Sequence, residues 1–335
     1  MKAVIMHAPG DVRVETVPDP TPQPGEALLR VRRVGLCGTD LSSWRGRNPL
    51  VSYPRIPGHE VAATVVEPGN SSLVPGTHVT LSPYANCGQC SACRNGRPNA
   101  CRDNRTLGVQ RDGALAEYIV SPADKLLTGN LQLEELCLVE PLTVGAHAVA
   151  RAQIAPRDTV AIFGCGGVGL GAIAASAFRG ATTIAIDVDD SKLATAREAG
   201  ATHLVNSTRD NLPDALATLT NGHGPDVVIE AVGSPATFRA AVELVSFTGR
   251  VVYIGYAKEP VTYETRLFVQ KELTILGARN ALPADFEQVI RMLEQHRFPV
   301  ARAITTTVPM DQTPHILRAW NDDPARFTRI MINLD

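Results

Sequence analysis

The sequence predicts an α/β protein of two domains, in which a β-rich domain precedes a doubly wound parallel sheet. The chain has 335 residues, more than one hydrophobic core usually serves. Short β-type segments broken by glycine and proline fill roughly the first 145 residues, and strands alternate with helices after that point. Hydrophobic residues make up 44% of the chain, which is enough for two cores.

In the first domain, residues 27–34 and 60–66 have the composition of strands bounded by turns. Residues 18–24 contain four prolines and predict an extended loop, because proline fixes φ and lacks an N–H. Residues 1–7 are too short in their apolar part for a signal peptide and fit a first strand.

The second domain shows the strand–helix alternation that is typical of a parallel sheet covered on both faces. Its predicted strands are 159–163, 182–187, 226–230 and 250–254, and its predicted helices are 169–179 and 191–199. We place the domains at 1–145, 146–285 and 286–335, the last being a segment that returns to the first domain.

Charge and hydropathy exclude several classes of partner. The formal net charge is -2 and no run of like charges occurs, so the sequence lacks the basic patch of a nucleic-acid or anionic-membrane binder. No apolar stretch is long enough to span a bilayer. We therefore expect a cytoplasmic protein that acts on a small molecule.

A glycine-rich turn follows the predicted strand 159–163. The pattern G-x-G-x-x-G opens a helix, and Asp187 ends the next strand eighteen residues after the last glycine. In this context glycines allow a pyrophosphate to approach the helix N-terminus, and the acid accepts hydrogen bonds from the ribose. The alternative is a tight turn without a ligand. We predict NAD, held by Gly164, Gly166, Gly167, Val168, Gly169 and Asp187.

Four of the seven cysteines fall within fifteen residues. An odd count in a chain without an export signal argues against disulfides. The spacing C-x2-C-x2-C-x7-C suits a closed tetrahedral S4 site, which is structural zinc. An iron–sulfur cluster is the main rival, but its usual spacing places the fourth cysteine after three residues. The predicted zinc lobe covers about 84–104, with ligands Cys87, Cys90, Cys93 and Cys101.

Three further segments contain side chains that bind zinc. They are Cys37-Gly38-Thr39-Asp40 after a strand, Gly58-His59-Glu60 before a strand, and Glu140-Pro141-Leu142. A catalytic zinc takes three protein ligands and keeps one open position. Taken singly, each residue also fits a core or turn position.

Together these motifs, in this order and spacing, resemble the zinc-containing medium-chain dehydrogenase/reductase family over essentially the whole chain. The resemblance implies a GroES-like β-barrel catalytic domain, a Rossmann domain, two zincs per subunit and an active site between the domains. By position, Cys37 and His59 are implied as catalytic-zinc ligands. Glutamate at 140, where alcohol dehydrogenases have cysteine, resembles the polyol and threonine dehydrogenase branch. Both Glu60 and Glu140 are kept as ligands, because the resemblance does not say which binds directly.

The implied reaction is hydride transfer from an alcohol carbon to the nicotinamide ring. Zinc lowers the pKa of the substrate hydroxyl, and the protein positions the reactants. Thr39 is expected to take the hydroxyl proton. Many relatives end this relay with a histidine five residues after the cysteine, where this chain has Ser42.

For the substrate, Glu140 favours polyols, sugar acids or hydroxy-amino acids. Residues 277–281 are similar to a stretch of hexonic-acid dehydrogenases that act on L-gulonate or L-galactonate at C5. Arg279, with Asn280 beside it, suits a substrate carboxylate, although a structural ion pair fits Arg279 equally well. Arg45 and Arg47 fit surface charges better. The order of preference is a sugar-acid 5-dehydrogenase, a polyol dehydrogenase and an L-threonine dehydrogenase.

Two other classes remain as alternatives. A zinc-free quinone or enone reductase on the same fold would lack Cys37, His59 and the cysteine lobe. A non-catalytic zinc- and NAD-binding protein would keep the fold without the chemistry, and Ser42 is the departure that favours it. Relatives form dimers or tetramers, so we expect a homodimer or homotetramer.

Overall fold

The computed structural model describes residues 1–335, which fold into two compact units. The first unit contains 1–140 and 300–335, and the second contains 141–299. The boundaries expected at 145/146 and 285/286 therefore differ from the observed divisions. The first falls inside helix α3 (Leu133–Arg151), and the second falls inside helix α9 (Pro283–Glu294), which packs against α4 (Gly167–Phe178) of the second unit.

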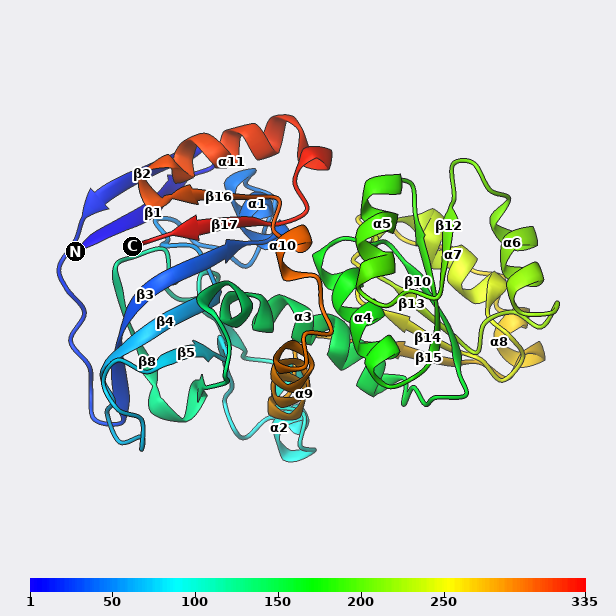
Figure 1. Cartoon of the computed structure of the whole chain (residues 1–335), viewed down its shortest axis with the longest axis horizontal. Helices are drawn as coiled ribbons and strands as arrows, with labels where there is room; N and C mark the ends of the chain where they lie inside the picture. Colours follow the sequence, from blue (N-terminus) through cyan, green and yellow to red (C-terminus); the bar gives the residue numbers. More distant parts are fainter. The chain divides into compact units, whose positions relative to one another are not determined.

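The first unit is built around a seven-stranded sheet with the order β16-β17-β3-β4-β5-β9, with β8 also paired to β3. Figure 1 shows the red C-terminal strand β17 beside the blue strand β3, so the end of the chain completes this sheet. The strands are β1 (Lys2–Ala8), β2 (Asp11–Thr16), β3 (Glu26–Leu36), β4 (Glu60–Glu67), β5 (His78–Leu81), β6 (Tyr84–Ala85), β7 (Arg105–Thr106), β8 (Tyr118–Pro122), β9 (Leu126–Leu127), β16 (Thr306–Pro309) and β17 (Ile330–Asn333). Its α-helices are α1 (Gly38–Trp44), α2 (Ser91–Arg94), α10 (Val300–Ala303), α11 (Thr313–Asp322) and the first part of α3.

Strand β3 bends the sheet toward a barrel. It pairs with β8 through its first half, with β17 through its last residues, and with β4 along much of its length. The β3–β4 register shifts between Leu28 and Leu29 and between Val31 and Arg33, and such irregularities bend and twist strands. Alternate residues of β3 and β4 are buried in one hydrophobic core, which Leu317 and Trp320 of α11 also enter.

The second unit has a six-stranded parallel sheet with the order β12-β11-β10-β13-β14-β15. The order reverses between β10 and β13, which is where doubly wound sheets bind ligands. Its strands are β10 (Thr159–Phe163), β11 (Thr182–Asp187), β12 (His203–Asn206), β13 (Val227–Glu230), β14 (Arg250–Tyr253) and β15 (Thr274–Gly277). Its helices, besides α4, α9 and the rest of α3, are α5 (Asp190–Glu198), α6 (Leu212–Leu219), α7 (Pro235–Leu244) and α8 (Arg266–Gln270).

Alternation along the strands explains why helices cover both faces of this sheet. Ala161, Phe163, Val228 and Val251 point into one core together with residues of α6 and α7. The intervening residues, such as Ile162, are also fully buried, and α4 packs against β10 and β11. No helix of the protein is both long and apolar enough to cross a membrane.

Candidate active site and zinc-binding residues

The first group of predicted ligands is organised at the end of β3. Cys37 is the N-cap of α1, and its Sγ accepts a hydrogen bond from the Thr39 backbone at 3.2 Å. The buried Asp40 carboxylate accepts from the backbone of Cys37 at 3.0 Å and of Gly58 at 3.3 Å. Asp40 therefore ties the cysteine loop to the turn that carries His59.

Cys37 and His59 converge, with 3.2 Å between Sγ and Nε2. A tetrahedral zinc with ordinary bond lengths places sulfur and nitrogen ligands about 3.5 Å apart, so the pair fits one metal ion. His59 is buried, and its Nδ1 atom makes no hydrogen bond. Burial raises the pKa of the Cys37 thiol, and the adjacent imidazole counteracts the rise.

Glu140 lies close to His59 and is itself buried. One ligand atom from each of His59, Glu60 and Glu140 falls within 4.8 Å of the others. The hydroxyl of Tyr84 donates a hydrogen bond to Glu140 Oε1. Burial raises the pKa of the Glu140 carboxyl, while His59 and the Tyr84 hydroxyl counteract the rise.

Glu60 has a different partner. Arg329, which precedes β17, donates to both carboxylate oxygens of Glu60, and both side chains are almost fully buried. The carboxylate also lies against Gly35, where a Cβ atom would be 2.0 Å from Glu60 Oε2. Arg329 thus contacts both oxygens of Glu60, although the Glu60 carboxylate also lies within 4.8 Å of ligand atoms of His59 and Glu140. We therefore favour Glu140 as the third ligand, and this assignment stays a prediction.

Neither Tyr84 nor Arg329 was predicted from the sequence. Arg329 follows no motif, and only the pairing of β17 with β3 and of β3 with β4 places it beside Glu60. Tyr84 stands three residues before Cys87, within the predicted zinc lobe, but a tyrosine in a turn-rich segment carries no distinguishing signal.

These residues fit a catalytic zinc. A partly buried thiol, a buried imidazole and a buried carboxyl together carry a desolvation cost that a divalent cation offsets, and they are the ligand types that zinc takes. Cys37, His59 and Glu140 would hold the ion, which when bound supplies a Lewis acid that favours ionisation of an alcohol. Thr39 lies two residues after Cys37 on α1 and is half-buried, as is Ser42. Their part in proton transfer stays a prediction.

The structure brings the four cysteines of the lobe together. Their Sγ atoms all lie within 4.8 Å of one another, and three separations are 3.5, 3.8 and 3.5 Å. Zinc–sulfur bonds of ~2.3 Å in a tetrahedron imply separations of about 3.8 Å. Backbone N–H groups of Cys93 and Arg102 lower the pKa of the Cys90 thiol to about 6, whereas burial and the neighbouring Cys90 and Cys101 thiols raise the pKa of Cys93 to about 11.

The glycine-rich turn lies at the reversal point of the parallel sheet. Gly164 has φ +92°, and a Cβ on Gly169 would approach the Gly164 carbonyl oxygen to 1.8 Å, so the turn requires both glycines. Gly166 is the N-cap of α4 and has open space around it. The Asp187 carboxylate accepts from the backbones of Cys165 and Val188 at 2.7 and 2.8 Å, which fixes it beside the turn.

The predicted substrate residues belong to the second unit. Arg279 and Asn280 follow β15, and Asn280 has φ +53°. Their contact with a substrate stays a prediction. Arg45 has a structural role in the first unit, because its guanidinium donates to Asn321 and joins α1 to α11. Arg47 is exposed.

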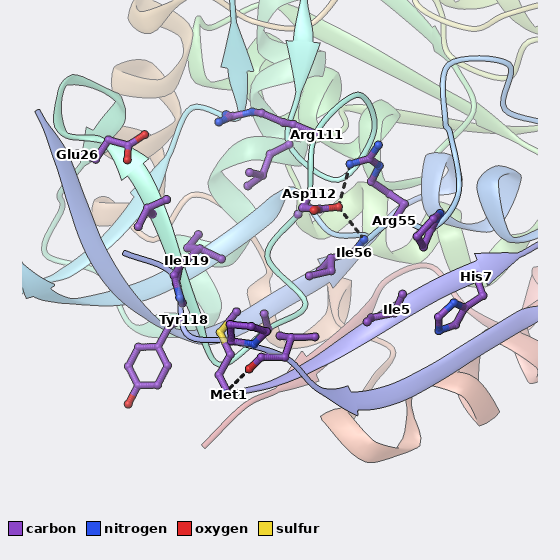
Figure 2. A pocket seen from close by; sticks show the side chains of 18 residues that line it. Met1, Ile5, His7, Glu26, Arg55, Ile56, Arg111, Asp112, Tyr118 and Ile119 are labelled. Atoms are coloured by element: carbon purple, nitrogen blue, oxygen red, sulfur yellow. Dashed lines mark hydrogen bonds and ion pairs between the residues drawn. The ribbon is translucent and has the colours of Figure 1, made fainter. Parts of the chain in front are cut away.

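A cavity of about 510 Å³ lies in the first unit, away from this chemistry. It is lined mainly by apolar residues of β1 and β8 and by residues 54–56 and 111–113, and none of the predicted site residues lines it. Figure 2 shows Asp112 on its wall, paired with Arg55 and with the Ile56 backbone, so these charges already have partners.

Sequence comparison identifies two families along the chain. Residues 23–130 match the family described as "Alcohol dehydrogenase GroES-like domain", and residues 167–295 match "Zinc-binding dehydrogenase". The chain is 33% identical to L-galactonate-5-dehydrogenase of Escherichia coli K12, over 91% of this chain and 94% of that one. It is 36% identical to sorbitol dehydrogenase of Bacillus subtilis, over 83% and 81%.

A solved alcohol dehydrogenase from Escherichia coli CFT073, crystallised with NADH, has the same fold. It superimposes with a TM-score of 0.91 at 28% identity, over 100% of this chain and 99% of that one.

Proposed function

Because the chain belongs to the zinc-containing medium-chain dehydrogenase family, whose members are NAD(P)-linked oxidoreductases, we propose that it oxidises the C5 hydroxyl of a hexonate such as L-gulonate or L-galactonate. The predicted GroES-like and Rossmann folds, the zinc and the NAD cofactor are confirmed by the families and by the NADH-bound structure. The substrate itself is our proposal.

The observation that carries this proposal is the buried Glu140 beside His59, which in turn lies 3.2 Å from Cys37 Sγ. A carboxylate in place of a second thiol gives the site the ligand set of the polyol and sugar-acid branch. The similarity to L-galactonate-5-dehydrogenase, which extends over nearly the whole chain, favours a sugar acid within that branch. Arg279 would then bind the substrate carboxylate through two parallel hydrogen bonds.

In this reaction the protein positions two reactants and handles one proton. Cys37, His59 and Glu140 would hold the zinc, and Asp187 would bind the adenosine ribose of NAD. NAD, when bound, would supply the hydride acceptor, and Thr39 would take the hydroxyl proton. Asp40 keeps the ligand loops in register through its two backbone hydrogen bonds.

A polyol is the second candidate, favoured by the similarity to sorbitol dehydrogenase at 36% identity. L-threonine follows. Polyols lack a carboxylate, so a polyol dehydrogenase would gain nothing from a guanidinium in the substrate site.

Steady-state formation of NADH from aldonates, polyols and L-threonine tests the proposal. We expect the highest kcat/KM for an L-hexonate, and the product should be the 5-ketone. The Arg279→Gln variant should raise KM for the hexonate much more than for sorbitol. Equal turnover of hexonate and sorbitol, or a preference for sorbitol, would contradict the sugar-acid assignment.

Cys37→Ala tests the catalytic site itself. Loss of one of three ligands should abolish turnover while the folded chain still binds NADH, because the cofactor residues lie in the other unit. Turnover and NADH fluorescence titration separate the two properties. An active Cys37→Ala enzyme would refute the ligand assignment.

We further propose that the protein is a homo-oligomer that pairs through β15. This strand ends the six-stranded sheet, and its outer edge faces no other strand. Ile275 on β15 is 40% exposed and Val269 on α8, which leads into it, is 83% exposed. Unpaired edges with exposed apolar residues favour pairing with another chain.

A further inference from the structure

We propose that the four-cysteine lobe supports the catalytic metal site, and that Tyr84 is the positioning residue through which it acts. The inference concerns how this chain holds its catalytic metal and does not depend on which alcohol is the substrate. It follows from a continuous chain of contacts that runs from the lobe cysteines to Glu140.

The first link is the hydrogen bond between Tyr84 and Glu140. Both side chains are buried, with Tyr84 7% and Glu140 4% exposed, and the Tyr84 hydroxyl donates to Glu140 Oε1. A bond to one oxygen fixes the rotation of the carboxylate and therefore the direction in which it faces His59. Partners of this kind orient metal ligands, and their loss typically weakens metal binding about 10–100-fold.

The second link is the short strand pair that carries Tyr84. Strand β6 has two residues and pairs with β7, with Tyr84 opposite Thr106 and Ala85 opposite Arg105. Next to this pair, the Leu107 backbone donates to the Pro83 carbonyl at 3.0 Å. A two-stranded ribbon of this length is not stable alone, so it requires support from its surroundings.

The third link is the lobe itself, which starts and ends at this ribbon. Cys87 comes three residues after Tyr84, and Cys101 comes four residues before Arg105. The Cys87 backbone donates to Cys101 Sγ at 3.3 Å, so the sulfur cluster closes the loop where it joins the ribbon.

The lobe has almost no core of its own. Between residues 85 and 100 the only buried residue is Asn99, and α2 buries none. The order of this segment must therefore come from a metal held by the four sulfurs, since a small segment without apolar burial does not fold alone. Metal in the lobe thus fixes β6 and β7, and these strands hold Tyr84 on Glu140.

The test measures metal retention at the catalytic site, with the catalytic position loaded with cobalt so that its visible spectrum reports ligand geometry. Tyr84→Phe removes a single oxygen, and Tyr118→Phe is the matched control, because Tyr118 lines the other cavity, to which no catalytic residue contributes (Figure 2). We expect Tyr84→Phe to release the catalytic metal to a chelator at least 10-fold faster than wild type, with an altered cobalt spectrum and an intact lobe zinc. Tyr118→Phe should behave as wild type.

The lobe is tested with Cys90→Ser and with Cys90→His, which keeps a zinc-binding side chain. Cys90→Ser should speed catalytic-metal release as Tyr84→Phe does, Cys90→His should restore much of the retention, and the double variant Cys90→Ser/Tyr84→Phe should lose no more than either single variant. Additive losses, or an unchanged catalytic site in Cys90→Ser, would overturn the proposal.

Zinc-release kinetics on the wild-type chain cover the case in which Cys90→Ser does not fold. Wild type should release its catalytic zinc only after the lobe zinc, whereas in Tyr84→Phe the catalytic zinc should leave first. Independent release in wild type would overturn the proposal.

Discussion

Two buried glutamates next to the same histidine have different partners, and these partners separate their roles. Arg329 binds both oxygens of Glu60, whereas Tyr84 donates a single hydrogen bond to Glu140. A carboxylate whose two oxygens both accept from a guanidinium is less available to a metal than one that accepts a single hydrogen bond from an uncharged hydroxyl. At the scale of single residues, this difference favours Glu140 over Glu60 as the predicted ligand.

The buried Glu60–Arg329 pair predicts that replacing one partner lowers the free energy of unfolding more than replacing both. Arg329→Met leaves a buried carboxylate without its cation and should cost about 3–5 kcal/mol of unfolding free energy. Replacing both residues with methionine should cost less than Arg329→Met alone. Denaturant unfolding of the three proteins measures this, and a double variant less stable than Arg329→Met would contradict the account.

We expect Asp187 to set a preference for NAD over NADP. Its carboxylate is held by backbone N–H groups at the end of β11, where it would meet the adenosine ribose and repel the 2′-phosphate of NADP. Asp187→Gly should raise KM for NAD. It should also lower the ratio of kcat/KM with NAD to kcat/KM with NADP, which measures the preference. An unchanged ratio would place the selectivity elsewhere.

At the scale of elements, hydrophobic pattern predicted four of the six strands of the parallel sheet. The expected strand 182–187 is β11 residue for residue, and the expected strand 159–163 is β10. The expected helix 191–199 is observed at Asp190–Glu198. These segments were predictable because buried β-branched runs and helix caps are local signals. The short strands β6 and β7 were not predictable, since their pairing depends on the closure of the lobe between them.

Close contact between α3 and α4 predicts a strong effect of one added methyl group. A Cβ on Gly145 of α3 would lie 2.2 Å from the Ala172 backbone nitrogen, and only separation of the helices would relieve that contact. Gly145→Ala should therefore cost at least the ~1–3 kcal/mol of an overpacked core.

Gly277→Ala is the matched control, because a Cβ there meets nothing within 4 Å. Thermal unfolding of both variants should show a lower midpoint for Gly145→Ala and little change for Gly277→Ala. Equal midpoints would mean that the helices adjust without cost.

At the scale of the whole molecule, the C-terminal segment forms part of the same sheet as strands from the first part of the chain. Strand β17 pairs with β3, although about 300 residues separate them, and brings Arg329 to Glu60. The segment from 300 onward thus belongs to the first unit both in packing and in the chemistry of the site.

The proposed pairing through β15 predicts that a single charged side chain on this strand reduces the number of subunits that associate. Ile275→Lys places a cation at the sheet edge and should shift the protein toward monomers, because charged edges disfavour strand pairing. Val74→Lys is the control, since Val74 is 67% exposed in the first unit. Light scattering after gel filtration measures the mass, and an unchanged mass for Ile275→Lys would rule out this edge.

The sequence by itself predicted four of the six strands of the parallel sheet, the glycine turn with Asp187, and the types of residue that bind zinc. These properties depend on local spacing, which a chain carries without folding. Only the tertiary structure decided that Glu60 belongs to Arg329 and Glu140 to Tyr84. Those partners come from distant segments, and no local pattern records which strands will pair.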